Sequence, residues 1–259
     1  MFRPGRLCCS IAHNVHVNTR AHAGDDAGLP HHSDRSLARF LRAKKDVARA
    51  ADQVQKFDAF VQERGFASLA YADVAGTHEQ QIVLVDPAWK NKSGQTLIWM
   101  RPARRKAETD AAAVEKMMFY TLNWLSLTYE EVQITGVALL GDLTGFQFKQ
   151  FDPSIPRTIL PLVQKIMPVR LKAIYMVNQP SFFSMIFSVI RVFMGEKVRS
   201  RLKILGDPKN LLPFIDLECI PASLGGTHAG AGSHAFFEHC RQLLCVELGP
   251  DDSANPLPA

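Results

Sequence analysis

Between residues 80 and 205, short apolar runs alternate with longer amphipathic segments, and this alternation restricts the fold more than any other feature of the sequence. The segment Val137–Leu140 is wholly apolar, as expected for a strand that is buried on both faces of a sheet. The pattern predicts strands at 81–85, 95–100, 132–143, 171–177 and 202–205. It predicts helices at 109–128, 156–169 and 182–203. Strands that alternate with helices form a sheet covered by helices, so the expected fold class is α/β.

Before this region, residues 36–60 repeat apolar side chains at helical spacing, with Ser33 or Asp34 as the N-cap. The first residues show no periodicity, and although their arginines resemble those of an organelle targeting peptide, we favour a disordered tail. We therefore divide the chain into four parts. These are a disordered N-terminal tail at 1–34, an N-terminal helical subdomain at 35–76, an α/β domain at 77–227, and a C-terminal tail at 228–259 with one possible helix.

Ala173–Ile190 is a largely apolar stretch of 18 residues without a charge. That length approaches the span of a bilayer. Asn178-Gln179-Pro180 divides the stretch in two, however, and indicates a strand, a turn and the start of a helix. We therefore expect no transmembrane helix here.

The positions of histidine and cysteine exclude several kinds of chemistry. All nine histidines lie outside residues 79–227, where the ordered core is expected, and the five cysteines show no C-x-x-C spacing. Most general-base and transition-metal sites use histidine, and structural zinc sites use closely spaced cysteines. The sequence therefore predicts no catalytic residues, no metal site and no cofactor, and we expect that the protein is not an enzyme.

The basic excess of the chain belongs to one segment. The chain carries 30 Lys and Arg against 25 Asp and Glu, a net charge of +5, whereas residues 165–209 alone carry nine basic and two acidic side chains. The remaining residues therefore sum to −2. A local excess of this kind indicates an anionic partner.

The segment Phe182–Met194 reads F-F-S-M-I-F-S-V-I-R-V-F-M and is apolar almost all round when placed on a helix. Ser184, Ser188 and Arg191 form one narrow polar stripe. Periodicity alone favours a central core helix. The alternative is a helix with one face over an internal cavity and another against a membrane. The basic residues that follow suit a membrane surface, or equally a solvated face at a helix C-terminus. They are Lys197, Arg199, Arg201 and Lys203.

Five strings occur in an order that is more specific than any one of them. They are R-F-L-R-A-K-K (39–45), D-L-T-G-F (142–146), I-Y-M-V-N-Q-P (174–180), F-S-V-I-R-V-F-M-G-E-K-V-R-S-R (187–201) and I-P-A-S-L-G-G (220–226). In this order the sequence resembles the CRAL-TRIO, or Sec14-like, lipid-binding family, in particular its tocopherol-transfer and retinaldehyde-binding branch. The resemblance covers about residues 35–227.

The resemblance implies a small helical N-terminal subdomain packed on an α/β domain whose sheet forms the floor of a lipid cavity. The helix at 182–194 corresponds to the gate of that cavity. Phosphoinositide-binding positions of the tocopherol-transfer branch match Arg170, Lys172, Lys197 and Arg201. Our candidates for the cavity lining or gate are Phe146, Phe148, Phe151, Ile174, Met176, Phe183, Ile186, Phe187, Ile190 and Phe193.

Two positions depart from the family pattern. Lys44-Lys45-Asp46-Val47 lacks the aromatic residue that usually follows the first string, so the first helix junction is expected to be repacked. The gate usually contains lysine-proline where this chain has Arg191-Val192, and without the proline we expect a straighter helix.

The predicted function is to bind a lipid or lipophilic vitamin-like molecule and to transfer it at membranes that contain phosphoinositides. We expect a cytoplasmic protein, peripheral on endosomal or other internal membranes, that binds no nucleic acid. The sequence leaves the oligomeric state open and favours a monomer. The alternative is an adaptor or regulatory protein with a degenerate cavity that binds a small GTPase or another protein through the same surface. An α/β enzyme is a third and weaker reading, because no nucleophile motif is present.

Overall fold

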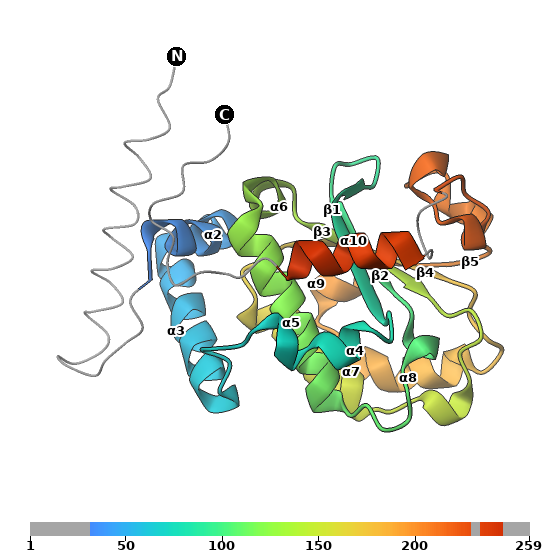
Figure 1. The fold of residues 1–259 in the computed structure, drawn as a ribbon, viewed down its shortest axis with the longest axis horizontal. Helices are drawn as coiled ribbons and strands as arrows, with labels where there is room; N and C mark the ends of the chain where they lie inside the picture. The colour runs from blue at the N-terminus through green and yellow to red at the C-terminus, as the bar shows by residue number, and fades with distance from the viewer. Residues whose placement is uncertain (1–31, 229–233, 246–259) are drawn as a thin grey trace, which may run out of the picture.

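A five-stranded sheet in the order β1-β2-β3-β4-β5 forms the centre of the computed structural model, which describes residues 32–228 and 234–245 (Figure 1). Strand β1 runs antiparallel to β2, and the other neighbouring pairs are parallel. The bounds are β1 Val83–Lys90, β2 Thr96–Met100, β3 Val137–Asp142, β4 Leu171–Val177 and β5 Leu202–Gly206. The α/β class is therefore confirmed.

Helices connect and cover these strands. In chain order they are α2 Asp34–Lys44, α3 Val47–Arg64, α4 Ala75–His78, α5 Ala111–Thr128, α6 Glu130–Thr135, α7 Ser154–Pro161, α8 Phe183–Phe193, α9 Glu196–Arg199 and α10 His234–Leu244. Residues 1–31, 229–233 and 246–259 lie outside the description, and with them most of the two predicted tails.

The parallel strands follow one another across the sheet, so each crossover from β2 to β5 moves in the same direction. Because parallel crossovers are right-handed, this order puts their helices on one face of the sheet. On that face α5, α7 and α8 pack over side chains such as Ile98 and Ile174. The opposite face is covered by α10 and by short turns between residues 208 and 224, over Leu97, Trp99 and Leu140.

The N-terminal region forms two helices, and not the single helix that its periodicity predicts. Lys45 has a left-handed backbone, with φ of 58°, and ends α2, while the carboxylate of Asp46 accepts a hydrogen bond from Arg49 N at 2.8 Å and starts α3. Of the two predicted N-caps, Ser33 fills this position, and its hydroxyl accepts from Ser36 N at 3.2 Å. An N-cap side chain inside an apolar repeat is the signal that separates the two helices.

Helices α2 and α3 form a pair at one side of the molecule, next to α5 (Figure 1). Phe40 packs edge-on against Phe57, with ring centroids 5.5 Å apart, and Phe57 stacks on Phe119 of α5. The buried guanidinium of Arg39 donates to Asn123 Oδ1 at 2.6 Å and to Ser126 Oγ at 3.1 Å, both on α5. Burial lowers the pKa of Arg39 to about 9, against the opposing effect of Asp58.

Three other predicted elements are wrong in part. The segment expected to begin a strand at residue 132 forms α6 up to Thr135, and β3 starts only after Gly136. The helix expected at 156–169 ends at Pro161 and continues as a π-helical turn at Leu162–Ile166, because proline lacks the N–H of a regular turn. The long helix expected at 182–203 is divided into α8, α9 and β5.

The possible helix of the C-terminal region is α10, which contacts β1 and lies across the sheet in Figure 1. Its Phe237 ring lies 5.0 Å from the ring of buried His78. His78 Nδ1 is 2.8 Å from the Tyr71 hydroxyl, whereas its Nε2 has no hydrogen-bond partner within the described residues. Burial, followed by the charge of Arg241, lowers the pKa of His78 to about 4, and Glu238 opposes this shift.

We expect His78 to make the protein less stable in acid. The folded protein holds this histidine neutral, whereas the unfolded chain protonates it below an ordinary pKa of about 6.5, so its contribution to stability is present above that pH and is lost as the pH falls toward 4. Between pH 7 and about pH 4.5 the loss amounts to about 2 kcal/mol. Urea unfolding of the native protein and of His78→Gln should show a smaller pH dependence in the variant. Equal pH dependences would contradict this assignment.

Candidate functional site

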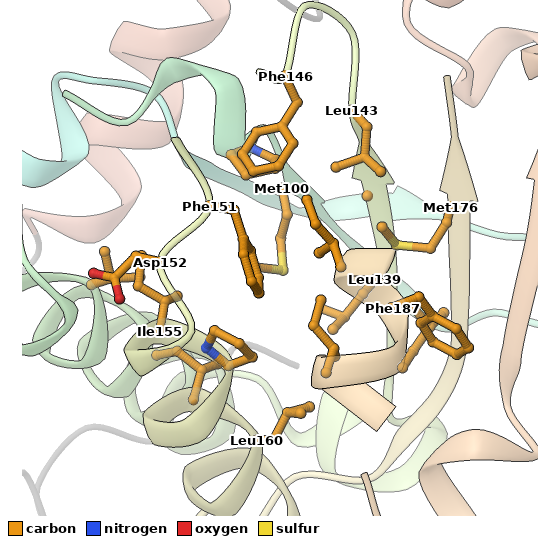
Figure 2. A pocket seen from close by; sticks show the side chains of 18 of the residues that line it. Met100, Leu139, Leu143, Phe146, Phe151, Asp152, Ile155, Leu160, Met176 and Phe187 are labelled. Carbon is orange, nitrogen blue, oxygen red and sulfur yellow. The ribbon is translucent and has the colours of Figure 1, made fainter. Parts of the chain in front are cut away.

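An apolar cavity of about 250 Å³ lies between the helix-covered face of the sheet and α5, α7 and α8 (Figure 2). Its floor consists of side chains that point to this face from four strands. These are Met100 on β2, Leu139 on β3, Ile174 and Met176 on β4, and Leu202 on β5. Gly141 of β3 also lies in the floor, where an added Cβ would come within 2.4 Å of Met176 Sδ. The glycine therefore allows the Met176 thioether to lie across β3.

Helix α8 covers this cavity with one face and exposes the other. Phe183, Ile186, Phe187 and Ile190 line the cavity at positions i, i+3, i+4 and i+7, which share one side of a helix. The Phe183 and Phe187 rings stack with centroids 5.7 Å apart.

The outer face of α8 is apolar as well. Met185 is 53% exposed, Val189 37% and Val192 79%. A core helix, which periodicity alone favoured, would bury these side chains. The structure shows instead a helix with an apolar inner face over the cavity and an apolar outer face in solvent, and we call this helix the lid.

Polar side chains occur only at the rim of the cavity, and each has local partners. Arg105 donates from Nη1 to Thr109 O at 2.7 Å and from Nη2 to Gln150 O at 2.8 Å. Asp152 Oδ1 accepts from Ser154 N at 2.9 Å and from its hydroxyl, and these hydrogen bonds lower the pKa of Asp152. Figure 2 shows the Asp152 oxygens directed away from the cavity. The interior therefore presents hydrocarbon, aromatic rings and thioethers to an occupant.

Most of the predicted cavity residues do line it. These are Phe146, Phe151, Ile174, Met176, Phe183, Ile186, Phe187 and Ile190. Phe148 and Phe193 do not. Phe148 is 52% exposed and packs edge-on against Phe182, with ring centroids 5.7 Å apart. Phe193 lies at the end of α8, where its carbonyl oxygen accepts a hydrogen bond from Gln164 Nε2 at 3.1 Å.

Sequence reasoning missed the walls contributed by helices α5 and α7 and by the ends of the strands. They include Met100, Val114, Met118, Leu139, Ile155, Ile159, Leu160 and Val163. Their apolar spacing signals burial but does not distinguish a cavity wall from packed core.

The predicted basic residues lie together at the end of the sheet where the parallel strands have their N-termini. Partial burial lowers the pKa of Lys172, and the charges of Arg170, Arg201, Lys45 and Lys197 lower it further. The structure thus brings the four predicted residues together and adds Lys45 from the corner between α2 and α3.

Lys44 belongs to the same group, because burial and then the charge of Lys197 lower its pKa. Within the described ranges, none of the ion pairs joins Lys44, Lys45, Lys172 or Lys197 to a carboxylate. We call these four residues the lysine cluster.

The two arginines are tied to the backbone, unlike the lysines. Arg170 Nη2 donates to Gln133 O at 3.0 Å and to Ile134 O, the last carbonyls of α6. Arg201 Nη1 donates to Leu171 O at the start of β4. Lys203 lies elsewhere, with its Nζ 4.9 Å from the centre of the Phe214 ring. The arginines therefore stabilise the backbone at the N-terminal end of the parallel strands, where the lysine cluster lies.

The CRAL/TRIO domain model matches residues 79–226, which include the whole sheet, the lid and the lysines Lys172 and Lys197. The chain belongs to the CRAL/TRIO domain family. This lipid-binding family is the one that the order of sequence motifs indicates.

Two curated human relatives and one solved structure are similar to this CRAL/TRIO chain. It is 31% identical over 116 residues to "Alpha-tocopherol transfer protein-like", a match that covers 43% of this chain and 34% of the relative. It is 36% identical over 100 residues to "Clavesin-2", covering 37% and 31%. The chain thus matches about a third of the length of each relative. The structure titled "Crystal structure of Sfh5" superposes with a TM-score of 0.59 over 81% of both chains at 16% identity, and shows the same fold.

No helix in residues 32–228 or 234–245 is long and apolar enough to cross a membrane. Within those same ranges, no three metal-ligating side chains lie close enough together to hold an ion.

The backbone contacts of Arg170 predict that it is needed for stability more than its neighbour Lys172. Replacing Arg170 by Met leaves two helix-terminal carbonyls without their charged donor, a loss of about 2 kcal/mol in the free energy of unfolding. Replacing exposed Lys172 by Met should change that free energy by less than about 0.5 kcal/mol. Chemical denaturation measures the free energy of unfolding of both variants. Equal losses in the two variants would show that the hydrogen bonds from Arg170 to α6 do not stabilise the fold.

Proposed function

We propose that this protein binds one hydrophobic ligand in the cavity and exchanges it at membranes that contain phosphoinositides. The observation that carries the proposal is the apolar cavity beneath α8, a helix with one apolar face over the cavity and another in solvent. Burial of a lipid chain stabilises a complex by about 0.8 kcal/mol per CH₂ group, so unassisted release into water would be slow. A transfer protein therefore requires a trigger that opens the lid at its destination.

The outer face of the lid and the lysine cluster provide that trigger. Met185, Val189 and Val192 offer exposed apolar side chains to the acyl region of a membrane. Lys197 follows the lid on α9, and anionic headgroups attract each such lysine by about 1 kcal/mol. Because a membrane would contact the outer face more fully when the lid is open, binding favours the open state by differential affinity.

One glutamine holds the far end of the lid. Gln164 Nε2 donates to Phe193 O at 3.1 Å, and Gln164 Oε1 accepts from Gly195 N at 2.8 Å. An added Cβ at Gly195 would lie 2.9 Å from that oxygen. Gln164 thus holds both ends of the segment between α8 and α9, and the Met194 side chain between them is buried. We place the opening movement there, and the site of action at the periphery of internal membranes.

A pair of tryptophan variants on neighbouring lid residues tests whether the cavity holds the ligand. Ile190→Trp places a large ring in the cavity, whereas Val189→Trp places the same ring in solvent. Ile190→Trp should lose at least about tenfold in uptake of lipophiles from mixed-lipid vesicles, measured by extraction and mass spectrometry of the recovered protein, because the ring occupies the ligand volume. Val189→Trp should retain uptake. Equal uptake by both variants would place the ligand elsewhere, and unfolding curves check that both variants are folded.

A double charge reversal tests the membrane surface. Lys172→Glu with Lys197→Glu removes two cations that make no ion pair within the described part of the chain, and should weaken binding to phosphoinositide vesicles by at least about 30-fold. Lys209→Glu is the matched control, since Lys209 lies in a groove at the opposite end of the sheet, where the parallel strands finish. Vesicle sedimentation measures the binding of the double variant and of the control. If the double variant binds as well as the control does, the lysine cluster is only a solvated face and does not bind membranes.

A further inference from the structure

Ser200 stands in the middle of an alternating basic sequence, K-V-R-S-R-L-K at 197–203. Basic residues flank it at positions −3, −1, +1 and +3. The side chains of Lys197, Arg199 and Ser200 are exposed, whereas Val198 between them is buried and anchors the turn. The charges of two of the flanking residues, Lys197 and Arg201, also act on Lys172 and lower its pKa.

The hydroxyl of Ser200 is not tied to the rest of the fold. Ser200 is the C-cap of α9, a helix of one turn, and its hydroxyl donates to Lys197 O within that turn at 3.0 Å. Its backbone N–H donates to Glu196 O at 2.9 Å, also within the turn. The edge strand β5 begins two residues later. A helix of one turn gains little stability from its own length, so the burial of Val198 is the main contact that holds this turn, while the Ser200 side chain stays exposed.

We propose that Ser200 is a phosphorylation site for a protein kinase that recognises basic side chains, and that its phosphate releases the protein from anionic membranes. The inference rests on the proposed membrane function and supplies its regulation. In the reaction the Ser200 oxygen forms a bond to the γ-phosphorus of ATP, and the bond between that phosphorus and the bridging oxygen breaks. ADP leaves, and the hydroxyl proton passes to a base of the kinase.

The phosphate would act by local electrostatics. It carries a charge of about −1.5 to −2 at neutral pH and accepts strong hydrogen bonds from guanidinium groups. Arg199 and Arg201 are its nearest partners in the sequence, and Arg199 is exposed. Arg201 uses Nη1 for Leu171 O and has no other partner among the described residues, so it retains donors for a phosphate. The added charge therefore opposes the same cations that would attract lipid headgroups.

Ser93 is also exposed and has lysines at positions −3 and −1. Both of these lysines form ion pairs, however, Lys90 with Glu131 and Lys92 with Asp216.

The exposed serines on α8 and at the far end of the sheet lack flanking basic residues on both sides. Ser184 and Ser188 lie on α8 among apolar side chains, and only Arg191 is near them in the sequence. Ser223 lies at the end of the sheet where the parallel strands finish, in the groove that also contains Lys209. Ser223 is therefore a suitable control for an added negative charge away from the lysine cluster.

The test combines site mapping with vesicle binding on the full chain. The protein is incubated with Mg²⁺, ATP and a kinase that selects serines flanked by basic residues, and phosphate is located by mass spectrometry. Sedimentation then compares modified and unmodified protein on phosphatidylcholine vesicles with and without phosphatidylinositol bisphosphate. Phosphate at Ser200 should weaken binding to the anionic vesicles by about 10- to 30-fold. Ser200→Glu should weaken it in the same direction, whereas Ser200→Ala and Ser223→Glu should bind as the native protein does.

The outcomes separate this inference from the proposed function. Native binding to anionic vesicles with no phosphate at Ser200, or with phosphate and unchanged affinity, overturns the regulatory inference and leaves the membrane function standing. Failure of the unmodified protein to bind the anionic vesicles overturns the membrane step, and the regulatory inference with it.

Discussion

The structure depends on one constraint of topology, the placement of all parallel crossovers on one face of the sheet. Helices α5, α7 and α8 must then cover that face alone, and they leave an apolar space of about 250 Å³ between them and the strands. At about 24 cal/mol per Å³, an empty cavity of this size costs on the order of 6 kcal/mol. A domain is stable by only about 5–15 kcal/mol, so a hydrophobic occupant offsets a cost comparable to the total stability of the protein.

The lid connects this cavity to the surface through a short series of contacts. Ile190 faces the cavity, Val192 faces solvent, and the carbonyl of Phe193 is held by Gln164. Gly195, held by the same glutamine, begins α9 and leads directly to Lys197 in the lysine cluster. A membrane that binds Lys197 and the outer face of α8 therefore contacts the same segment of chain that covers the cavity.

How much the sequence could predict depended on whether a signal was local. Strand β4 was predicted with its exact bounds, because Leu171–Val177 is apolar except for Lys172 and is bounded by Arg170 and Asn178. Helix α6 was missed because Val132 and Ile134 alternate like strand residues, and its end is fixed by a distant guanidinium, that of Arg170. The lid residues were predicted from a helix that was apolar all round. Val114 and Met118 of the opposite wall were not, since core and cavity use the same side chains. Lys44 and Lys45 joined the lysine cluster only through tertiary packing.

The central claim is that the cavity is a ligand site and not a packing defect. Native mass spectrometry of the gently purified, unaltered protein tests it most directly. The account predicts a species heavier than the chain by the mass of one lipophilic molecule, which organic extraction removes and identifies. A spectrum that shows only the mass of the bare chain, before and after incubation with mixed lipids, would contradict the account.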